Sequence, residues 1–298
     1  MTTTSVKQRA IALGFFDGLH LAHKAVLTAA LEQQKNGQTP AVLLFDEHPF
    51  EALTGNRIDR LMTDEDRRAA LLGMGFEILD VSFRAIRDLS PEAFVRRLLR
   101  ETYGCGFVSC GYNYTFGAGG RGNAGTLKTL CAAEGIGTAV CDRVRHNGAD
   151  VCSSAIREAI RQGDLQTANE MLGAAFSFSS TVLHGDSRGA GLGFPTANLA
   201  LPKALVVPKA GVYATTAQTE DGTLHPAVTD VGRRPTFDGK GIRCETFLLD
   251  FSGDLYGRPL RVFFHAFLRE EKAFPSPEAL REQIGRDAEQ AAALLTVT

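Results

Sequence analysis

The sequence predicts an α/β domain with a parallel sheet, followed by a small β-barrel domain with a terminal helix. In the first half, short apolar runs alternate with amphipathic helical patterns, as in βαβ units. Beyond about residue 175, segments rich in Val, Thr and Phe follow one another without intervening helices, which is typical of a barrel. The 298 residues suffice for two domains of ordinary size, which we place at residues 1–170 and 175–298.

The first domain is predicted from strands and helices that alternate along the chain. The expected strands are Ile11–Leu13, Ala41–Phe45, Phe76–Phe83, Phe107–Cys110 and Thr138–Asp142. The expected helices are His20 to about Gln34, with Gly37 as its stop, Thr63–Leu72, and a segment that begins after Ser90. Thr63 and Asp66 have capping-box spacing, and Ser90 with Pro91 supplies an N-cap and a first helical residue.

Two short helices are expected to connect the domains: one capped by Ser153 or Ser154 and running to Arg161, and one capped by Asp164 and ending at Gly173. The expected barrel strands are Ser177–Leu183, Val212–Thr219, His225–Val231, Arg243–Phe251 and Leu260–Phe267. The turn signals Asp221-Gly222 and Asp238-Gly239 separate some of them. The segment from Pro277 to about Leu295 is predicted to be one helix, with Leu280 and Ile284 on a common face.

The composition is that of a folded, water-soluble chain whose positive and negative charges nearly balance. Apolar residues make up 44% and charged residues 22%, and the net charge is −2, so nothing global favours a nucleic-acid or membrane partner. No apolar run reaches the length of a membrane span, and Asp17 ends the apolar stretch that begins at Ile11. We therefore expect a cytoplasmic protein, and the sequence predicts no particular oligomeric state.

The six cysteines favour buried thiols over disulfides or a zinc site. They are scattered through apolar segments, and no two of them form a C-x-x-C pair.

The segment Gly14–His23 (GFFDGLHLAH) follows the first predicted strand and opens a helix. The N-terminus of a helix presents free N–H groups and a partial positive charge, which suit a phosphate. His20 and His23 are three residues apart and share one face of the first turn, where both imidazoles can donate hydrogen bonds to a triphosphate. The alternative is a pair of surface histidines at a helix start.

A second glycine pattern, Gly117–Gly122, matches G-x-G-x-x-G, and Asp142 follows the last glycine at the spacing of a dinucleotide-binding site. The preceding strand is expected to end near Cys110, whereas that site needs its glycines directly at the turn from strand to helix. A flexible glycine-rich loop is therefore the preferred interpretation.

The densest motif is Gly189–Leu199 (GAGLGFPTANL). Its glycines would let backbone amides approach phosphate oxygens, and the Thr196 hydroxyl and Asn198 carbonyl are hard ligands suited to nucleotide-bound Mg²⁺. On spacing alone, a simple turn explains the motif equally well.

Compared with known families, the N-terminal half resembles the nucleotidyltransferase domain of bacterial bifunctional riboflavin kinase/FAD synthetases. His20–His23 resembles the H-x-G-H signature with Ala22 in place of glycine, and Phe45–Pro49 resembles the F-x-P-H-P loop with Glu47 in place of proline. Gly111–Gly117 resembles G-x-[DN]-[FY]-x-F-G. Val151–Arg157 resembles I-S-S-T-x-I-R, with Cys152 and Ser154 as replacements.

This resemblance implies a Rossmann-like fold of the HxGH type and a role for each matching residue. It implies catalytic contacts with the ATP phosphates from His20, His23 and Arg157, and flavin contacts from His48 and Asn113. It also implies a nucleotide-binding set that comprises Gly14, Phe16, Asp17, Gly18, Ser153 and Ser154.

The C-terminal half resembles riboflavin kinases, whose signature core is G-x-P-T-A-N. Further ordered matches are Pro208–Ala214, Val231–Phe237, Glu245–Phe251, Gly253–Gly257 and Leu268–Phe274, with Phe247 in place of a usual histidine. The resemblance implies that Gly193, Pro195, Thr196 and Asn198 bind the nucleotide, with Thr196 and Asn198 as the metal ligands. It implies Glu245 as the base for the ribityl hydroxyl and Arg269 as a flavin or phosphate contact. An exposed strand glutamate and a surface arginine are the alternatives for the last two.

The resemblance thus implies an enzyme that makes FMN from riboflavin and then FAD from FMN, with ATP as co-substrate and Mg²⁺ as cofactor. Ala22 and Cys152 leave open a kinase whose N-terminal site is inactive. A flavin-binding regulator without catalysis is a third possibility, against which Thr196, Asn198 and Glu245 argue.

Overall fold

The computed structural model describes residues 8–184, 193–233 and 242–295. By their internal contacts these residues form two compact units. Unit 1 comprises residues up to Ile58 together with Asp64–Cys152, and unit 2 comprises Asp59–Thr63 and the chain from Ser153 onward. The contacts thus divide the chain at Cys152, ahead of the domain boundary placed at residues 170–175, because helix α8 (Leu165–Leu172) packs on the strands of unit 2.

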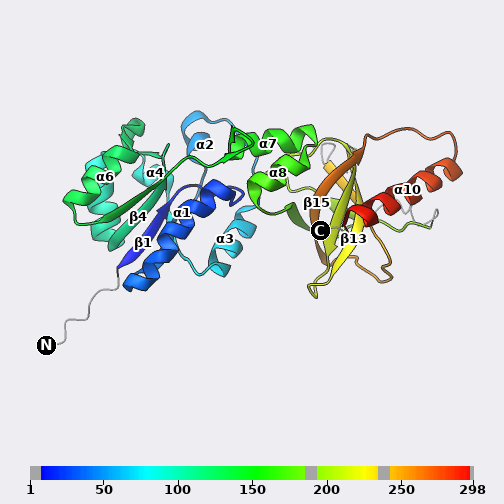
Figure 1. Ribbon diagram of the computed structural model, residues 1–298, viewed down its shortest axis with the longest axis horizontal. Helices are drawn as coiled ribbons and strands as arrows, with labels where there is room; N and C mark the ends of the chain where they lie inside the picture. The colour runs from blue at the N-terminus through cyan, green and yellow to red at the C-terminus, as the bar shows by residue number, and fades with distance from the viewer. Residues whose placement is uncertain (1–7, 185–192, 234–241, 296–298) are drawn as a thin grey trace. The chain divides into compact units, whose positions relative to one another are not determined.

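Unit 1 contains a five-stranded sheet in the order β3-β2-β1-β4-β7 whose neighbouring strands are all parallel (Figure 1). The strands are β1 (Arg9–Leu13), β2 (Thr39–Phe45), β3 (Glu77–Val81), β4 (Cys105–Gly111) and β7 (Gly137–Cys141). The predicted α/β architecture is confirmed. One strand end is wrong, because Phe83 begins a short helix instead of ending the third strand.

The helices of unit 1 cover both faces of this sheet. They are α1 (Leu21–Leu31), α2 (Pro49–Thr54), α3 (Asp64–Gly73), α4 (Phe83–Ile86), α5 (Pro91–Ala93) and α6 (Ala124–Ala133). Helix α1 continues as the 3-10 helix η1 (Glu32–Asn36), and α5 continues as the π-helix η2 (Phe94–Thr102). Helices α1 and α3 share a core with Ala10 and Ala12 of β1, while η2 and α6 share a core with Ile11 and Leu13. Alternate residues of one buried strand therefore serve two cores.

The G-x-G-x-x-G segment does not form a turn from strand to helix. Strand β5 (Thr115–Phe116), the 3-10 turn η3 (Ala118–Gly120) and β6 (Gly122–Asn123) form a small antiparallel hairpin. Its glycines follow β4 only after an intervening turn, so the segment lacks the geometry of a dinucleotide site. It forms a hairpin instead of the flexible loop that the sequence predicted. A second hairpin, β8 (Arg145–His146) and β9 (Ala149–Asp150), completes unit 1.

Unit 2 is built on a six-stranded antiparallel sheet in the order β10-β15-β12-β13-β14-β11. The strands are β10 (Phe176–Thr181), β11 (Ala197–Ala200), β12 (Gly211–Gln218), β13 (Leu224–Arg233), β14 (Ile242–Leu248) and β15 (Pro259–Arg269). A further bridge between Leu183 and Asn198 brings the two edges together, so the sheet nearly closes into the predicted barrel. Sequence reasoning treated β11 only as a motif and did not identify it as a strand.

The helices of unit 2 are α7 (Ser153–Gln162), α8 and the terminal α10 (Pro277–Leu295). Helix α10 packs through Ala291 on Val212, Ala214 and Val228, on the outside of the sheet. Asp164 caps α8, as predicted, by accepting a hydrogen bond from the backbone N–H of Thr167.

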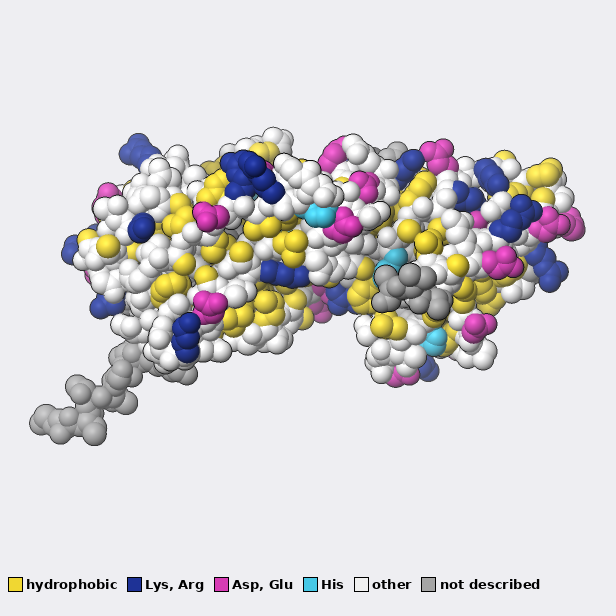
Figure 2. All heavy atoms as spheres, viewed as in Figure 1, with side chains coloured by type: hydrophobic (Ala, Val, Ile, Leu, Met, Phe, Trp, Pro, Cys, Tyr) yellow, Lys and Arg dark blue, Asp and Glu magenta, His cyan; other side chains and the backbone are white. Residues whose placement is uncertain are grey.

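The described surface and interior agree with the composition. Figure 2 shows basic and acidic side chains interspersed over the face in view. All six cysteines are free thiols. Four of them are buried, as expected, whereas Cys141 and Cys152 are partly exposed. No helix in the described ranges is both long and apolar enough to cross a membrane.

Candidate active sites

The turn between β1 and α1 is held in an unusual backbone conformation. Phe16 and Leu19 have φ angles of 58° and 46°, in the left-handed region that costs a residue with a side chain about 1–2 kcal/mol. At Gly14, a Cβ atom would approach the Phe16 ring to 3.1 Å, so this position favours glycine. Non-glycine residues in this region persist only where the surrounding structure holds them, and they are concentrated at functional sites.

Two histidines meet where this turn enters helix α1. His20 is the N-cap, and its Nδ1 accepts a hydrogen bond from the backbone N–H of His23 at 3.3 Å. The two rings stack with their centroids 3.6 Å apart and their planes inclined by 15°. Asp17 and His20 are nearly fully buried. The structure therefore brings the predicted His20, His23, Phe16 and Asp17 together around one helix N-terminus, instead of leaving surface histidines.

His23 is held as a neutral imidazole. Burial lowers its pKa well below the ordinary value of 6.5, and the neighbouring His20 and Arg67 lower it further. Its Nδ1 atom is buried and has no hydrogen-bond partner. A neutral ring can donate a hydrogen bond to a phosphate oxygen, but it adds no charge.

Arg67 on helix α3 is a buried cation of this site that sequence reasoning missed. Its Nη1 donates to the backbone carbonyl of Phe15 at 2.8 Å, and its guanidinium lies 4.2 Å from the centre of the Phe15 ring. No motif marks this position. The only available signal was the amphipathic helix pattern, which does not distinguish a buried arginine from its exposed neighbour Arg68.

The predicted flavin contacts of unit 1 lie on separate loops. His48 caps α2, and its ring meets the Phe15 ring edge-on with centroids 4.3 Å apart. Glu47, which replaces a motif proline, forms an ion pair with Arg84 at 2.6 Å. Asn113 is exposed in the turn that follows β4. His48 is thus linked to the phosphate turn through Phe15, whereas Asn113 has no such link among the described contacts.

The residues that depart from the family motifs sit in ordinary backbone. Ala22 is the second residue of α1, where alanine is the best helix former and no glycine conformation is required. Cys152 directly precedes α7, whose first two residues are Ser153 and Ser154. Arg157, one turn further along, is 6% exposed. The second predicted phosphate segment therefore also opens a helix.

In unit 2 the predicted catalytic base faces a predicted metal ligand. Strands β11 and β14 pair antiparallel, with Asn198 directly opposite Glu245. On the other side of β14, Asp230 of β13 lies opposite Glu245. Directly paired residues project to the same face of a sheet, so Asn198, Glu245 and Asp230 form one polar row.

The loop that carries Thr196 is attached to the same face. Asn198 is 6% exposed, and its Nδ2 lies 3.4 Å from the Thr196 carbonyl oxygen. Phe194 packs edge-on against Phe247 with centroids 5.2 Å apart, which is the packing that the replacement of the family histidine provides. Gly193 and Pro195 flank Phe194. The glycines at 189–192 and the motif residues at 234–237 lie outside the described residues.

Arg269 is engaged by the terminal helix. Its guanidinium forms an ion pair with Asp287 of α10, with Nη2 and Oδ2 2.7 Å apart, and the Asp287 side chain is 3% exposed. The described contacts thus attach α10 to β15, and flavin binding by Arg269 stays a prediction.

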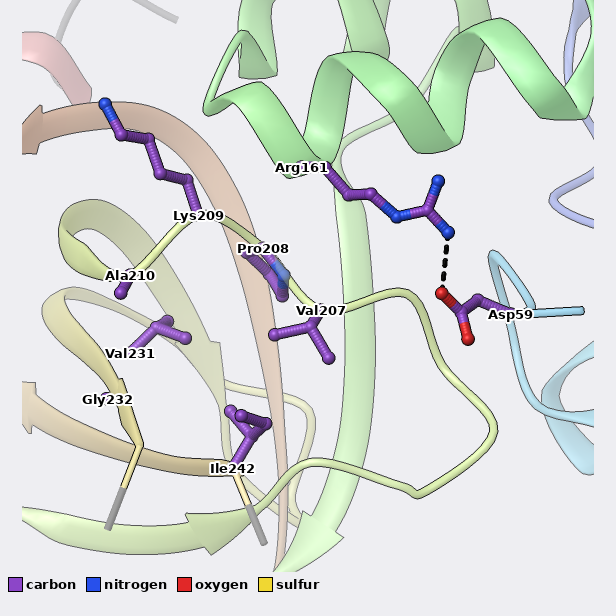
Figure 3. Close-up of a pocket in the computed structure, with 9 residues that line it drawn as sticks. All are labelled: Asp59, Arg161, Val207, Pro208, Lys209, Ala210, Val231, Gly232 and Ile242. Carbon is purple, nitrogen blue, oxygen red and sulfur yellow. Dashed lines mark hydrogen bonds and ion pairs between the residues drawn. The ribbon is translucent and has the colours of Figure 1, made fainter. Parts of the chain in front are cut away.

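A pocket of about 530 Å³ opens at one end of the barrel (Figure 3). Val207, Pro208, Ala210, Val231 and Ile242 line it, and Asp59 and Arg161 form an ion pair at 2.6 Å on its wall. Asp59 belongs to the short segment Asp59–Thr63, which pairs with the loop between β11 and β12 through a parallel bridge from Arg60 to Leu205. Sequence reasoning missed this pocket because its lining residues come from distant segments.

Comparison with known proteins matches each half of the chain to one enzyme family. The FAD synthetase family model matches residues 2–155, and the riboflavin kinase family model matches residues 172–295. A bifunctional riboflavin kinase/FMN adenylyltransferase of Listeria monocytogenes serovar 1/2a is 34% identical over 94% of this chain and 90% of its own length. The enzyme of that name from Pseudomonas fluorescens is 35% identical over 95% of this chain and 91% of its own.

A solved structure is similar over nearly the whole fold. A Streptococcus pneumoniae chain described as a macrolide-efflux protein superposes with a TM-score of 0.87 and 27% identity, covering 97% of this chain and 95% of that one.

Proposed function

The chain belongs to the bifunctional riboflavin kinase/FMN adenylyltransferase family, and from this premise we propose that it makes both flavin cofactors. The residues matched to riboflavin kinase transfer the γ-phosphoryl group of ATP to riboflavin, giving FMN and ADP. The residues matched to FAD synthetase transfer the adenylyl group of a second ATP to FMN, giving FAD and pyrophosphate. Both reactions use small soluble molecules, and we expect them to occur in the cytoplasm.

The kinase reaction needs a base because a ribityl hydroxyl is a poor nucleophile while it is protonated. Glu245 accepts that proton as the hydroxyl oxygen bonds to the γ-phosphorus and the bond to the β-phosphate oxygen of ADP breaks. The position of Glu245 opposite Asn198 supports this role, because it puts a carboxylate beside the residues proposed to hold the nucleotide phosphates. This cross-strand pair is the single observation that carries the proposal for unit 2.

The donor set around Thr196 fits a magnesium ion bound to a nucleotide. No three His, Cys, Asp or Glu side chains gather into a metal-binding group within the described part of the chain. The Thr196 hydroxyl and Asn198 carbonyl are neutral hard oxygens, and Asn198 is almost buried, so they suit an ion that keeps several water and phosphate ligands. Bound there, Mg²⁺ would neutralise charge on the transferred phosphoryl group.

The adenylyltransferase reaction needs positioning and charge rather than a base. An FMN phosphate oxygen is already anionic at neutral pH and attacks the α-phosphorus of ATP, and pyrophosphate leaves. His20 and His23 donate hydrogen bonds to the phosphates at the start of α1, and the family resemblance assigns further phosphate contacts to Arg157, Ser153 and Ser154. The stacked histidine pair and the strained turn before it support this assignment.

The alternative with an inactive N-terminal site rested on Ala22 and Cys152. Ala22 lies in regular helix, where its methyl group causes no backbone strain. We therefore favour two active sites.

A time course tests this proposal. Purified chain is incubated with riboflavin, ATP and Mg²⁺, and the three flavins are separated by chromatography with fluorescence detection. We expect FMN to appear first and FAD to follow. FMN alone would support the kinase-only alternative, and the absence of both products would overturn the proposal in favour of flavin binding without catalysis.

A further inference from the structure

Arg67 lies outside every motif of the sequence, but it is placed to supply positive charge to the adenylyltransferase site. Arg67 is only 4% exposed, although it carries a permanent positive charge. Its Nη2 pairs with Asp64 at 2.8 Å, but the Asp64 side chain is 69% exposed, so water solvates that carboxylate and weakens its compensation of the guanidinium charge. The guanidinium thus places a permanent positive charge at the edge of the phosphate turn, in which Asp17 is also buried, at 3% exposed.

Arg67 also holds the phosphate turn in place. Its Nη1 donates to the Phe15 carbonyl at 2.8 Å, directly before Phe16, one of the two non-glycine residues of that turn with left-handed backbone. The guanidinium also makes a cation–π contact with the Phe15 ring, and the His48 ring packs edge-on against the same phenyl ring. Arg67 therefore contacts both the backbone of the turn and the Phe15 ring against which His48 packs.

The neighbouring His23 supplies no positive charge of its own. His23 remains neutral at physiological pH, since burial lowers its pKa, with His20 and Arg67 lowering it further. A neutral histidine can orient a triphosphate but cannot offset the charge that grows on the departing pyrophosphate. An arginine is always protonated and can do so.

We propose that Arg67 is a positioning residue of the adenylyltransferase site, which holds the Gly14–Leu19 turn through the Phe15 carbonyl and supplies the permanent positive charge beside the His20–His23 pair. This inference rests on the proposed function of unit 1.

The test compares Arg67→Met, Arg67→Lys and Arg68→Met in the full chain. Arg68 is the matched control, because it lies on the same helix and forms an ion pair with Asp80, but its side chain is 44% exposed. FMN and ATP are supplied, and kcat and KM for FAD formation are measured. Riboflavin phosphorylation by the same samples and thermal unfolding serve as controls for unit 2 and for folding.

We expect Arg67→Met to lower kcat for FAD formation by about 100-fold, the size typical of losing one preorganised electrostatic contact. Arg67→Lys should recover about tenfold of that loss, because it keeps the charge but loses the two-pronged geometry. Arg68→Met should stay within about twofold of wild type, and all three variants should phosphorylate riboflavin normally.

A purely structural Arg67 would lower the unfolding temperature and leave kcat per folded molecule unchanged, which would overturn the proposal. If Arg67→Met does not fold, Arg67→Lys decides the question, since wild-type kcat in that variant would also overturn it. A wild-type chain that makes FMN but no FAD would instead refute the proposed function of unit 1, so the two failures are distinguishable.

Discussion

The ion pair between Arg269 and Asp287 should be a main attachment of the terminal helix. Arg269 donates through Nε to both Asp287 carboxylate oxygens at 3.0 Å and through Nη2 to Oδ2 at 2.7 Å. Asp287 is 2% exposed, and its other side-chain partner is Gln283, at 2.9 Å. Arg269→Met would therefore leave a buried carboxylate with one neutral donor.

Breaking a buried pair from one side costs about 3–5 kcal/mol. We expect about 3 kcal/mol here, because the Arg269 side chain is 20% exposed and water can reach the vacated position. For a unit of this size, each kcal/mol lowers the melting temperature by about 2–4 °C, so the shift should be roughly 10 °C. Thermal unfolding followed by circular dichroism measures it, and riboflavin kinase activity after heating assigns the transition to unit 2.

Two further variants make the reasoning refutable. Arg286→Met removes a pair with Glu282 whose side chains are both about two-thirds exposed or more, and it should change stability by less than about 0.5 kcal/mol. Arg269→Met with Asp287→Leu replaces both charges by apolar groups and should recover most of the loss. A single Arg269→Met variant that melts within 2 °C of wild type would refute the assignment, with 2 °C taken as about the shift for 1 kcal/mol.

The other predictions concern the two sites. The lowered pKa of His23 means that below pH 6.5 the unfolded chain binds more protons than the folded one. The stability of unit 1 should therefore fall as the pH drops through 6.5, by at most about 1.4 kcal/mol per pH unit, and His23→Gln should remove this contribution in urea unfolding from pH 5 to 8. If the unfolding free energy of His23→Gln depended on pH as steeply as that of wild type, this prediction would be contradicted. Glu245→Gln should lower kcat for riboflavin phosphorylation by about 10²–10⁴-fold in a chromatographic assay while FMN is still converted to FAD; near-normal phosphorylation would exclude Glu245 as the base. Ala22→Gly should cost about 0.5–1 kcal/mol in unit 1, measured by urea unfolding, because glycine weakens a helix, and it should not raise the rate of FAD formation. A large gain in that rate would show that the Ala22 methyl group crowds the nucleotide.

The fold could be predicted well because its signals are local and repeated. Buried parallel strands form continuous apolar runs, and Ser90 and Asp164 were identified as N-caps from their residue types alone. The end of β3 at Val81 was missed because Phe83 suits a strand as well as it suits the first turn of α4. Strand β11 was missed because three of its four residues lie inside a motif and its ladder partner, β14, is distant in sequence.

Candidate site residues could be proposed from the sequence where they lie within one short segment. His20 and His23 lie within one helical turn, and Thr196 and Asn198 lie at and just inside the start of β11. Arg67 could not be predicted, because its role depends on a bond to the carbonyl of Phe15, 52 positions earlier. The pairing of Asp287 with Arg269 depends equally on where α10 docks, which no local pattern encodes.

The most direct test of two separate sites on one chain mixes two inactivated variants. Glu245→Gln should make FAD from supplied FMN but almost none from riboflavin, and His23→Ala should make FMN from riboflavin and stop there. Mixed together with riboflavin, ATP and Mg²⁺, they should restore FAD formation, because FMN released by one variant is the substrate of the other. If Glu245→Gln cannot use supplied FMN, or if His23→Ala no longer makes FMN, the account of two independent sites is contradicted.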